Sequence, residues 1–131
     1  MGDQATRARI RQFADAINTA DMDVFDALYH DDVVIEWPQS GEVIRGKKNI
    51  RELRLAYPTP PTATLRRIAG SGDLWAMEMV FDYDGDRFHV IVFHQYRDGL
   101  VERETAYYAA PFQAPAWRAR WVEPAASSAP N

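Results

Sequence analysis

The sequence predicts a single α+β domain in which an antiparallel sheet packs helices on one side. Apolar residues recur at helical spacing in the first part of the chain, whereas from residue 62 onward they alternate as in half-buried strands. Helices followed by a run of strands are typical of the α+β class. With 131 residues, of which 47% are hydrophobic, the chain can bury one core and shows neither an internal repeat nor a second domain.

Three helices are expected before the main sheet. The first has Ile10 and Phe13 on an apolar face, and the second begins after Asp21, a good N-cap residue. The third ends before the proline-rich segment 58–61, because proline donates no backbone hydrogen bond and disfavours helix in its predecessor. The expected helices are Asp3–Thr19, Met22–Tyr29 and Lys47–Tyr57.

Six strands complete the expected fold. A strand that Pro38 stops is followed by a short one, and four longer strands follow the third helix. The expected strands are Val33–Trp37, Gly41–Arg45, Thr62–Ala69, Leu74–Tyr83, Arg87–Tyr96 and Leu100–Tyr108.

The pair Asp84-Gly85 separates two alternating apolar runs and predicts a tight hairpin. A two-residue turn there pairs Tyr83 with Asp86 and, further out, Trp75 with His94. Because successive side chains alternate between faces, one face of this hairpin is almost entirely apolar. It carries Trp75, Met77, Met79, Phe81, Phe88, Val90, Val92, His94 and Tyr96. His94 is therefore the strongest chemical lead in the sequence.

Composition excludes several function classes. The chain has no cysteine, so disulfides, thiol chemistry and cysteine-bound metals are excluded. No apolar run approaches bilayer-spanning length and the N-terminus lacks a signal-peptide segment, so we expect a cytoplasmic protein with no membrane partner. A net charge of -4 without a basic cluster argues against nucleic acid. The adjacent residues 30–32 do not predict a metal site, and we expect neither metal nor cofactor.

The C-terminal segment differs from the rest of the chain. Residues 109–121 are irregular but contain Trp117 and Trp121, which we expect to pack over an exposed sheet face or against a partner subunit. The final residues are rich in Ala, Ser and Pro and lack apolar anchors. We therefore expect one domain over residues 1–123 and a disordered tail over 124–131.

Three segments resemble a known family: IRQFADAINTADMDVFDALYHDDVVIEWP, then GEVIRGKKNIREL, and later FHQYRDGLVERETAYY. In element order they are similar to the SnoaL-like branch of the nuclear transport factor 2-like superfamily. The resemblance implies a cone-shaped fold, in which a curved mixed or antiparallel sheet wraps around a pocket that three helices help to close. Homodimers are common in the superfamily. Its members include ketosteroid isomerases, polyketide cyclases, dehydratases, epoxide hydrolases and proteins without catalysis, so the fold alone does not settle function.

Matching the family's motifs residue by residue narrows the possible activities. The three positions that hold the base and the oxyanion donors of ketosteroid isomerases fall on Trp37, Phe13 and Val92, which are all apolar, so that activity is not expected. The polyketide cyclase pattern implies an acidic acid–base residue on the last strand and a histidine on the strand before it. Here these positions are Glu104 and His94.

The turn between these two strands decides whether Glu104 faces the pocket. A three-residue loop, 97–99, pairs Val92 with Glu104 and turns Glu102 and Glu104 inward. A two-residue Asp98-Gly99 turn reverses the alternation, so that Arg103 and its alternate neighbours point inward instead. The resemblance favours the first arrangement.

An inward pair of His94 and Glu104 predicts a cofactor-independent acid–base enzyme of cyclase, isomerase or dehydratase type, acting on a hydrophobic carbonyl compound. Three alternatives stay open: a histidine buried for packing, a non-catalytic binder of an apolar metabolite, and a dimerising scaffold. The expected partners are a small hydrophobic molecule and a second copy of the chain. The candidate ligand-contacting residues are Phe13, Trp37, Tyr57, Trp75, Met77, Val92 and Tyr108.

Overall fold

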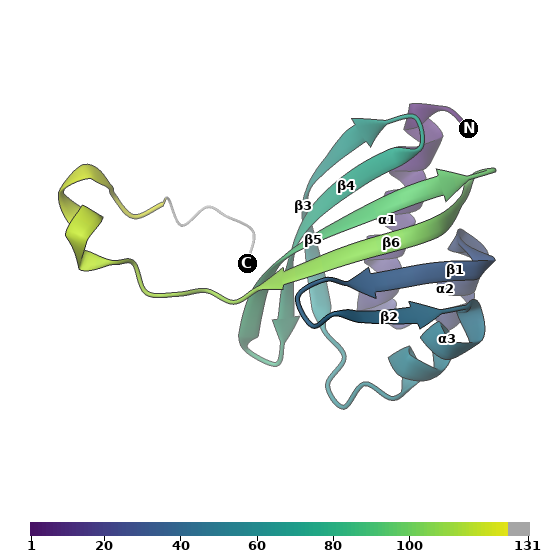
Figure 1. Ribbon diagram of the computed structural model, residues 1–131, viewed down its shortest axis with the longest axis horizontal. Helices are drawn as coiled ribbons and strands as arrows, with labels where there is room; N and C mark the ends of the chain where they lie inside the picture. Colours follow the sequence, from purple (N-terminus) through teal and green to yellow (C-terminus); the bar gives the residue numbers. More distant parts are fainter. Residues whose placement is uncertain (126–131) are drawn as a thin grey trace.

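The computed structural model describes residues 1–125, and positions 126–131 of the expected tail lie outside the described residues. Three α-helices precede the long strands, as the sequence predicts, and a short 3-10 helix follows the last strand (Figure 1). The elements are α1 (Asp3–Thr19), α2 (Met22–Leu28), β1 (Tyr29–Trp37), β2 (Glu42–Arg45), α3 (Lys47–Leu55), β3 (Thr62–Ser71), β4 (Leu74–Tyr83), β5 (Asp86–Arg97), β6 (Leu100–Ala109) and η1 (Ala116–Trp121).

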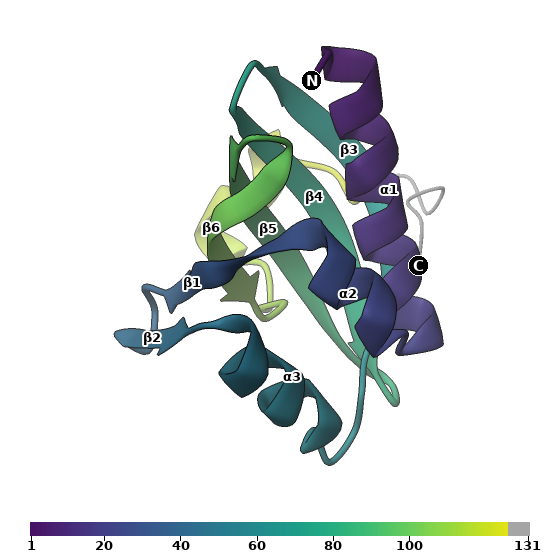
Figure 2. The ribbon, with the colours of Figure 1, turned by 90° about the vertical axis from the view of Figure 1, so that its right-hand side faces the viewer.

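The six strands form one mixed sheet in the order β2-β1-β6-β5-β4-β3. Neighbouring strands are antiparallel except β1 and β6, which are parallel. The sheet curves, α1 runs along one of its faces, and α2 and α3 lie at the β1–β2 end (Figure 2). This arrangement confirms the expected α+β cone. No helix in the described part of the chain is long and apolar enough to cross a membrane.

The β4–β5 hairpin has the register that the sequence predicts. Tyr83 pairs with Asp86 and Trp75 with His94, and both turn residues, Asp84 and Gly85, have positive φ. The inward side chains of both strands form the centre of the core under α1. His94 is among these fully buried residues.

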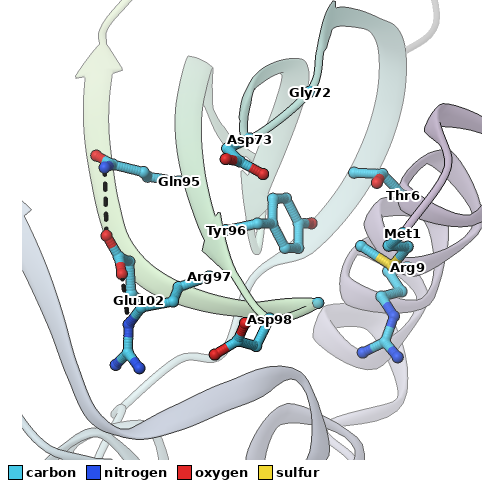
Figure 3. Close-up of a pocket in the computed structure, with 11 residues that line it drawn as sticks. Met1, Thr6, Arg9, Gly72, Asp73, Gln95, Tyr96, Arg97, Asp98 and Glu102 are labelled. Carbon is cyan, nitrogen blue, oxygen red and sulfur yellow. Dashed lines mark hydrogen bonds and ion pairs between the residues drawn. The ribbon is translucent and has the colours of Figure 1, made fainter.

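The β5–β6 hairpin follows neither of the two predicted registers. It begins as a two-residue turn, with Arg97 opposite Leu100, but Glu102 then stands unpaired as a bulge and shifts the ladder by one residue. Glu102 turns to the outer side and bonds the side chains of Gln95 and Arg97, as Figure 3 shows. Beyond the bulge Glu104 lies opposite His94 and is buried. The expected inward position of Glu104 is thus correct, whereas that of Glu102 is wrong.

Strand β1 begins four residues earlier than predicted. Tyr29, expected as the last residue of the second helix, has extended backbone angles and pairs with Val101 of β6. Its side chain is fully buried next to β6. The change of element therefore places a phenol inside the cone.

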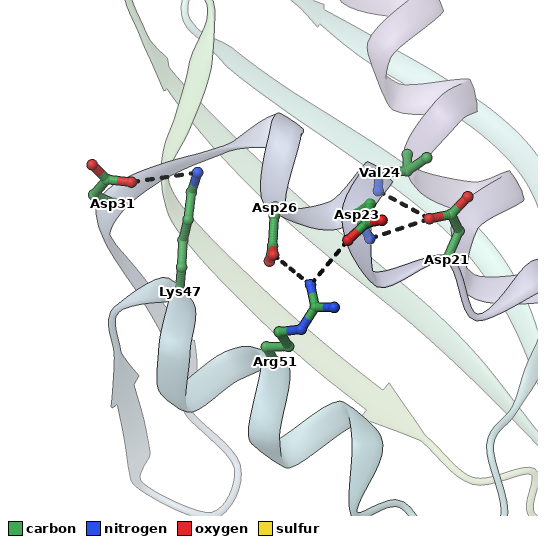
Figure 4. A network of polar contacts seen from close by, with 7 residues as sticks. All are labelled: Asp21, Asp23, Val24, Asp26, Asp31, Lys47 and Arg51. Carbon is green, nitrogen blue, oxygen red and sulfur yellow. Dashed lines mark hydrogen bonds and ion pairs between the residues drawn. The ribbon is translucent and has the colours of Figure 1, made fainter.

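Ion pairs hold α3 against α2 and β1 (Figure 4). Arg51 of α3 contacts Asp23 and Asp26 of α2, and Lys47 contacts Asp31 of β1. Asp21 caps α2 by accepting hydrogen bonds from two backbone amides, as predicted. These contacts fix the helix whose inner face carries Arg54.

We expect Trp75→Ala to lower the free energy of unfolding by about 3–5 kcal/mol, because a large buried ring is deleted from a packed core. Trp75 is 1% exposed and its indole N–H donates to the carbonyl of Gly72. Urea titration followed by circular dichroism measures the change. The control is Leu55→Ala, an exposed leucine at the end of α3, which should shift stability by no more than about 0.5 kcal/mol. Equal effects of the two variants would contradict this description of the core.

Candidate functional site

A cavity of about 210 Å³ lies between the helices and the inner face of the sheet. Its walls are mostly apolar, and among the described residues the only charged side chains that line it are Arg54 and Glu104, which have opposite charges. The remaining lining residues are Phe13, Ile17, Ala20, Met22, Phe25, Leu55, Tyr57, Pro60, Pro61, Phe81, Val92 and Tyr108. A small apolar chamber with few converging polar groups is the usual form of a binding or active site.

Glu104 is the centre of a buried polar network. Its Oε1 accepts a hydrogen bond from the Tyr29 hydroxyl at 2.7 Å and lies 2.7 Å from His94 Nε2. Tyr29 in turn accepts a hydrogen bond from Arg54 Nη2 at 2.9 Å. Because both contacts of the carboxylate use Oε1, Oε2 is the oxygen available to the cavity that Glu104 lines.

The network keeps Glu104 ionised. Burial alone raises the pKa of a carboxyl group, but the hydrogen bond from His94, the Arg54 guanidinium and the Tyr29 hydroxyl together outweigh it and lower the pKa of Glu104 below its usual value. The same surroundings act in the opposite direction on the phenol, since burial raises the pKa of Tyr29 well above 10. Tyr29 therefore remains a neutral hydrogen-bond donor at neutral pH.

Arg54 supplies a free donor beside this carboxylate. Its Nη1 is buried and has no hydrogen-bond partner among the described residues, while its guanidinium lies 3.9 Å above the Phe25 ring. A buried donor without a partner costs about 1–3 kcal/mol. A ligand oxygen placed in the cavity could satisfy this group, and Arg54 is thus suited to hold a carbonyl or an enolate oxygen.

His94 supports Glu104 and does not line the cavity. Its ring stacks edge-on against Phe13 with 4.7 Å between centroids, and its Nδ1 is buried without a partner among the described residues. A proton on Nδ1 would have no acceptor there, so the geometry favours the tautomer whose Nε2–H donates to Glu104. His94 therefore orients the carboxylate, and the cavity geometry gives it no direct contact with a ligand.

The structure separates the other candidate residues into two groups. Four of them line the cavity, as expected: Phe13, Tyr57, Val92 and Tyr108. Trp75 and Met77 are buried in the core instead, because alternation along a strand defines the face of a side chain but not its depth. This placement assigns both residues to packing.

Trp37 lines a second hollow, an open groove of about 690 Å³ at the mouth of the cone. Tyr57 and Tyr108 line both the groove and the inner cavity, so the two spaces adjoin across these rings. Tyr83 and Phe88 extend the aromatic wall of the groove, and Gln39, Ser40 and Glu42 form its polar rim. The mouth can thus hold an apolar part of a ligand that is too large for the inner cavity.

A third hollow, of about 730 Å³, lies at the opposite end of the sheet (Figure 3). It is polar, and Arg9 and Asp73 line it together with the edge of Tyr96. It is lined by charged side chains of both signs, and Glu104 is not among its lining residues. The inner cavity, which Glu104 lines, and the mouth groove that adjoins it are therefore the spaces in which a ligand can meet Glu104.

Stability should depend on pH through Glu104. Its pKa is lower in the folded protein than in the unfolded chain, where it is about 4.3, so the folded state gains stability above that value. This contribution disappears as the pH falls through the lower, folded pKa. We expect the stability difference between the wild-type chain and Glu104→Gln to be largest near neutrality and to shrink below about pH 4. Urea titrations across pH measure this; a difference independent of pH would contradict it.

Sequence reasoning missed Tyr29 and Arg54. The sequence predicts that Tyr29 ends a helix, and an aromatic ring at a helix end gives no sign of a partner on β6. Arg54 follows the buried Ile50 by four residues, and this spacing places both on one face of α3. That spacing was the available signal for an inward arginine.

The protein is a small α+β cone protein that forms a pocket. A curved mixed sheet and three helices surround its apolar cavity, which contains a buried acidic residue. The chain belongs to the SnoaL-like domain family, which it matches over residues 10–104. The family lies within the nuclear transport factor 2-like superfamily. Among curated proteins, no sequence matches the chain.

Solved structures share this fold over 79% to 98% of the chain. A nuclear transport factor 2-like protein of unknown function from Burkholderia xenovorans LB400 is 35% identical, with 95% of this chain and 98% of that chain covered and a TM-score of 0.87. A candidate ketosteroid isomerase from Kribbella flavida DSM 17836 is 29% identical, with coverages of 98% and 96% and a TM-score of 0.88. IdmH, a candidate polyketide cyclase from Streptomyces antibioticus, is 20% identical, with coverages of 79% and 91% and a TM-score of 0.65.

Proposed function

We propose that this protein is a cofactor-independent acid–base enzyme that acts on a small hydrophobic carbonyl compound in the inner cavity. The observation that carries the proposal is that an ionised carboxylate, Glu104, and a guanidinium, Arg54, line one apolar chamber, and that Arg54 Nη1 has no hydrogen-bond partner among the described residues. A base and an electrophile that face one small space are the requirements for removing a proton next to a carbonyl group.

In the proposed reaction, Arg54 Nη1 donates a hydrogen bond to the carbonyl oxygen, and Glu104 Oε2 takes a proton from the adjacent carbon. The electrons of the broken C–H bond form the enolate, whose oxygen carries the charge that the guanidinium stabilises. Glu104, now protonated, returns the proton to carbon or to a leaving group. Isomerisation, cyclisation and dehydration share this first step.

The surroundings of Glu104 narrow the substrate class. A carboxylate with a lowered pKa is a weak base, so its substrate should have a C–H group made acidic by two neighbouring groups, such as two carbonyls or a carbonyl and an aromatic ring. The apolar walls and the aromatic mouth groove favour a flat, hydrophobic molecule. At the three matching positions, Trp37 cannot act as a base, and Phe13 and Val92 cannot donate a hydrogen bond to an oxyanion, which argues against a ketosteroid isomerase mechanism.

A proton-exchange assay tests the proposal without knowledge of the natural substrate. The probe is 2-tetralone, a fused-ring ketone whose C1 protons are acidified by both the carbonyl and the ring. In D₂O, the protein should accelerate loss of the C1 proton signal in the NMR spectrum above the buffer rate. Binding of the ketone without faster exchange would contradict the enzyme proposal.

The alternative is a non-catalytic binder of an apolar metabolite. It is favoured by the two contacts that already occupy Glu104 Oε1, since such a network also serves simply to satisfy a buried carboxylate. The same probe distinguishes the two functions, because a binder shifts the ketone signals on titration and leaves their exchange rate unchanged.

A further inference from the structure

We propose that the third hollow is a second ligand site, which binds a small zwitterionic amino carboxylate such as a dipeptide. The hollow lies beside the first turns of α1, between the β3–β4 and β5–β6 turns (Figure 3). Its volume of about 730 Å³ is within the range of roughly 300–1,000 Å³ that is usual for small-molecule pockets. Neither Glu104 nor Arg54 lines it, so this site is separate from the proposed catalytic one.

Hydrogen bonds between distant segments hold the frame of the hollow. On the β3–β4 turn, the N–H of Gly72 donates to the Asp3 carboxylate of α1 at 3.2 Å, and the indole N–H of Trp75 donates to the Gly72 carbonyl at 2.8 Å. The next residue, Asp73, accepts a hydrogen bond at its carbonyl from the N–H of Tyr96 on β5, also at 2.8 Å. The turn is thus tied to α1 and to β5, and little conformational freedom is lost when a ligand binds.

Two hydrogen-bond donors meet on one side of the hollow. The Tyr96 side chain is buried, with 5% of the residue exposed, and its hydroxyl points toward Thr6 and Arg9 of α1 without a hydrogen-bond partner among the described residues (Figure 3). Burial raises the pKa of Tyr96 to about 12, although the charge of Arg9 acts in the opposite direction. Tyr96 is therefore a neutral donor next to a cation, and a carboxylate group can accept hydrogen bonds from both.

Two carboxylates line the hollow from its turns. Asp73 belongs to the β3–β4 turn and Asp98 to the β5–β6 turn, and neither forms an ion pair within the described part of the chain. The other charged side chains of the lining, Arg97 and Glu102, bond each other at 2.8 Å. The carboxylates of the two turns can thus accept hydrogen bonds from an ammonium group.

The opposite charges in the hollow are not joined to one another. Arg9 lies on α1 and the two aspartates on separate hairpin turns, and no ion pair connects them among residues 1–125. A purely anionic ligand would be repelled by the two carboxylates, and a purely cationic ligand by the guanidinium. A molecule with one carboxylate and one ammonium group matches both parts of the wall.

The C-terminal segment of the chain does not fill the hollow. It leaves the end of β6 and stands clear of the sheet, far from the N-terminus of α1 (Figure 1). Trp117 is 76% exposed and Trp121 68%, so the predicted packing of these rings over the chain's own sheet is not observed. The hollow is therefore open to a ligand from solution.

The first experiment is calorimetric titration of the full-length chain with L-alanyl-L-alanine. We expect saturable binding with a dissociation constant in the millimolar range or below. The N-acetyl derivative of this dipeptide keeps only the carboxylate, and its C-terminal amide keeps only the ammonium group. Each derivative should bind about tenfold or more weakly, because one charged contact is lost. Equal affinity for all three molecules would contradict recognition of both charges.

Variants test the location of the dipeptide. Arg9→Gln, Tyr96→Phe and Asp73→Asn should each weaken binding by about fivefold or more, since each removes one charged or hydrogen-bonding group from the hollow. The matched controls are Arg11→Gln on α1 and Asp86→Asn on β5, both at exposed positions outside the lining. They should leave the affinity unchanged. Circular dichroism checks that each variant is folded.

The outcomes separate this site from the proposed catalytic cavity. Dipeptide affinity should be the same in Glu104→Gln as in the wild-type chain, because Glu104 does not line the hollow. Absence of saturable binding, equal losses in Arg9→Gln and Arg11→Gln, or a loss in Glu104→Gln would each overturn the proposal. None of these measurements requires that the protein accelerate proton exchange in a ketone.

Discussion

Glu104→Gln should reduce the rate of enzyme-promoted proton exchange in 2-tetralone by about 10²–10⁴-fold, which is the usual contribution of a general base. The amide has the shape of the carboxylate and keeps an oxygen that can accept from Tyr29 and His94, but it cannot take a proton from carbon. The NMR exchange assay measures the change, and titration of the same ketone measures its affinity. Because binding rests mainly on the apolar walls, we expect affinity to change by less than tenfold.

The matched control for this variant is Glu52→Gln, which removes an exposed carboxylate from α3. It alters net charge by the same amount and should leave both exchange rate and affinity at wild-type values. A second comparison is His94→Gln, which should reduce exchange less than Glu104→Gln, because His94 positions the carboxylate without lining the cavity. Full exchange activity in Glu104→Gln would exclude Glu104 as the base.

Arg54→Met should lower the exchange rate by about 10²–10³-fold, because the variant loses the donor that stabilises the enolate oxygen. The methionine keeps apolar contact with Phe25 but removes the positive charge that helps to hold Glu104 ionised. The pKa of Glu104 should therefore rise, and the pH at which exchange activity begins should move upward with it. We also expect a loss of about 1–3 kcal/mol in stability, since Tyr29 and Glu104 lose a favourable buried neighbour.

Arg51→Met provides the control on the same helix. Arg51 pairs with Asp23 and Asp26 at the protein surface and does not line the cavity (Figure 4). Surface ion pairs contribute about 0–1 kcal/mol, so this variant should cost little stability and leave the pH profile of exchange unchanged. If the two arginine variants behaved alike, the loss in Arg54→Met would reflect damage to α3 rather than loss of the donor.

The elements that could be predicted from sequence are those with strong local signals. Asp84-Gly85 defines its own turn geometry, and with it the pairing of β4 and β5 down to Trp75 and His94. The sequence also predicts that Glu104 faces inward near His94, but it does so from a three-residue loop that pairs Val92 with Glu104. In the structure Glu104 lies opposite His94 instead. The bulge at Glu102 depends on contacts with Gln95 and Arg97 that no local pattern shows.

The parts that could not be predicted depend on tertiary packing. The network around Glu104 joins side chains from α3, β1, β5 and β6, so each bond links residues that are distant in sequence. Tyr29 and Arg54 carry no motif, and their roles follow only when β1 lies parallel to β6 with α3 above it. How deeply an inward side chain lies in the cone also depends on tertiary packing. The sequence therefore predicts that Trp75 and Met77 face inward, but it does not show that they lie in the packed core and not in the cavity wall.

The bulge at Glu102 has a consequence for the comparison of related sequences. Because this residue stands outside the ladder, a relative that lacks it could keep a regular hairpin and still direct its acidic residue inward. The distance in sequence from the Asp98-Gly99 turn to the acidic position can thus differ by one between proteins with the same chemistry. Alignments of this hairpin should be anchored on the inward-facing Ala106 and Tyr108, and gaps should be placed next to the turn.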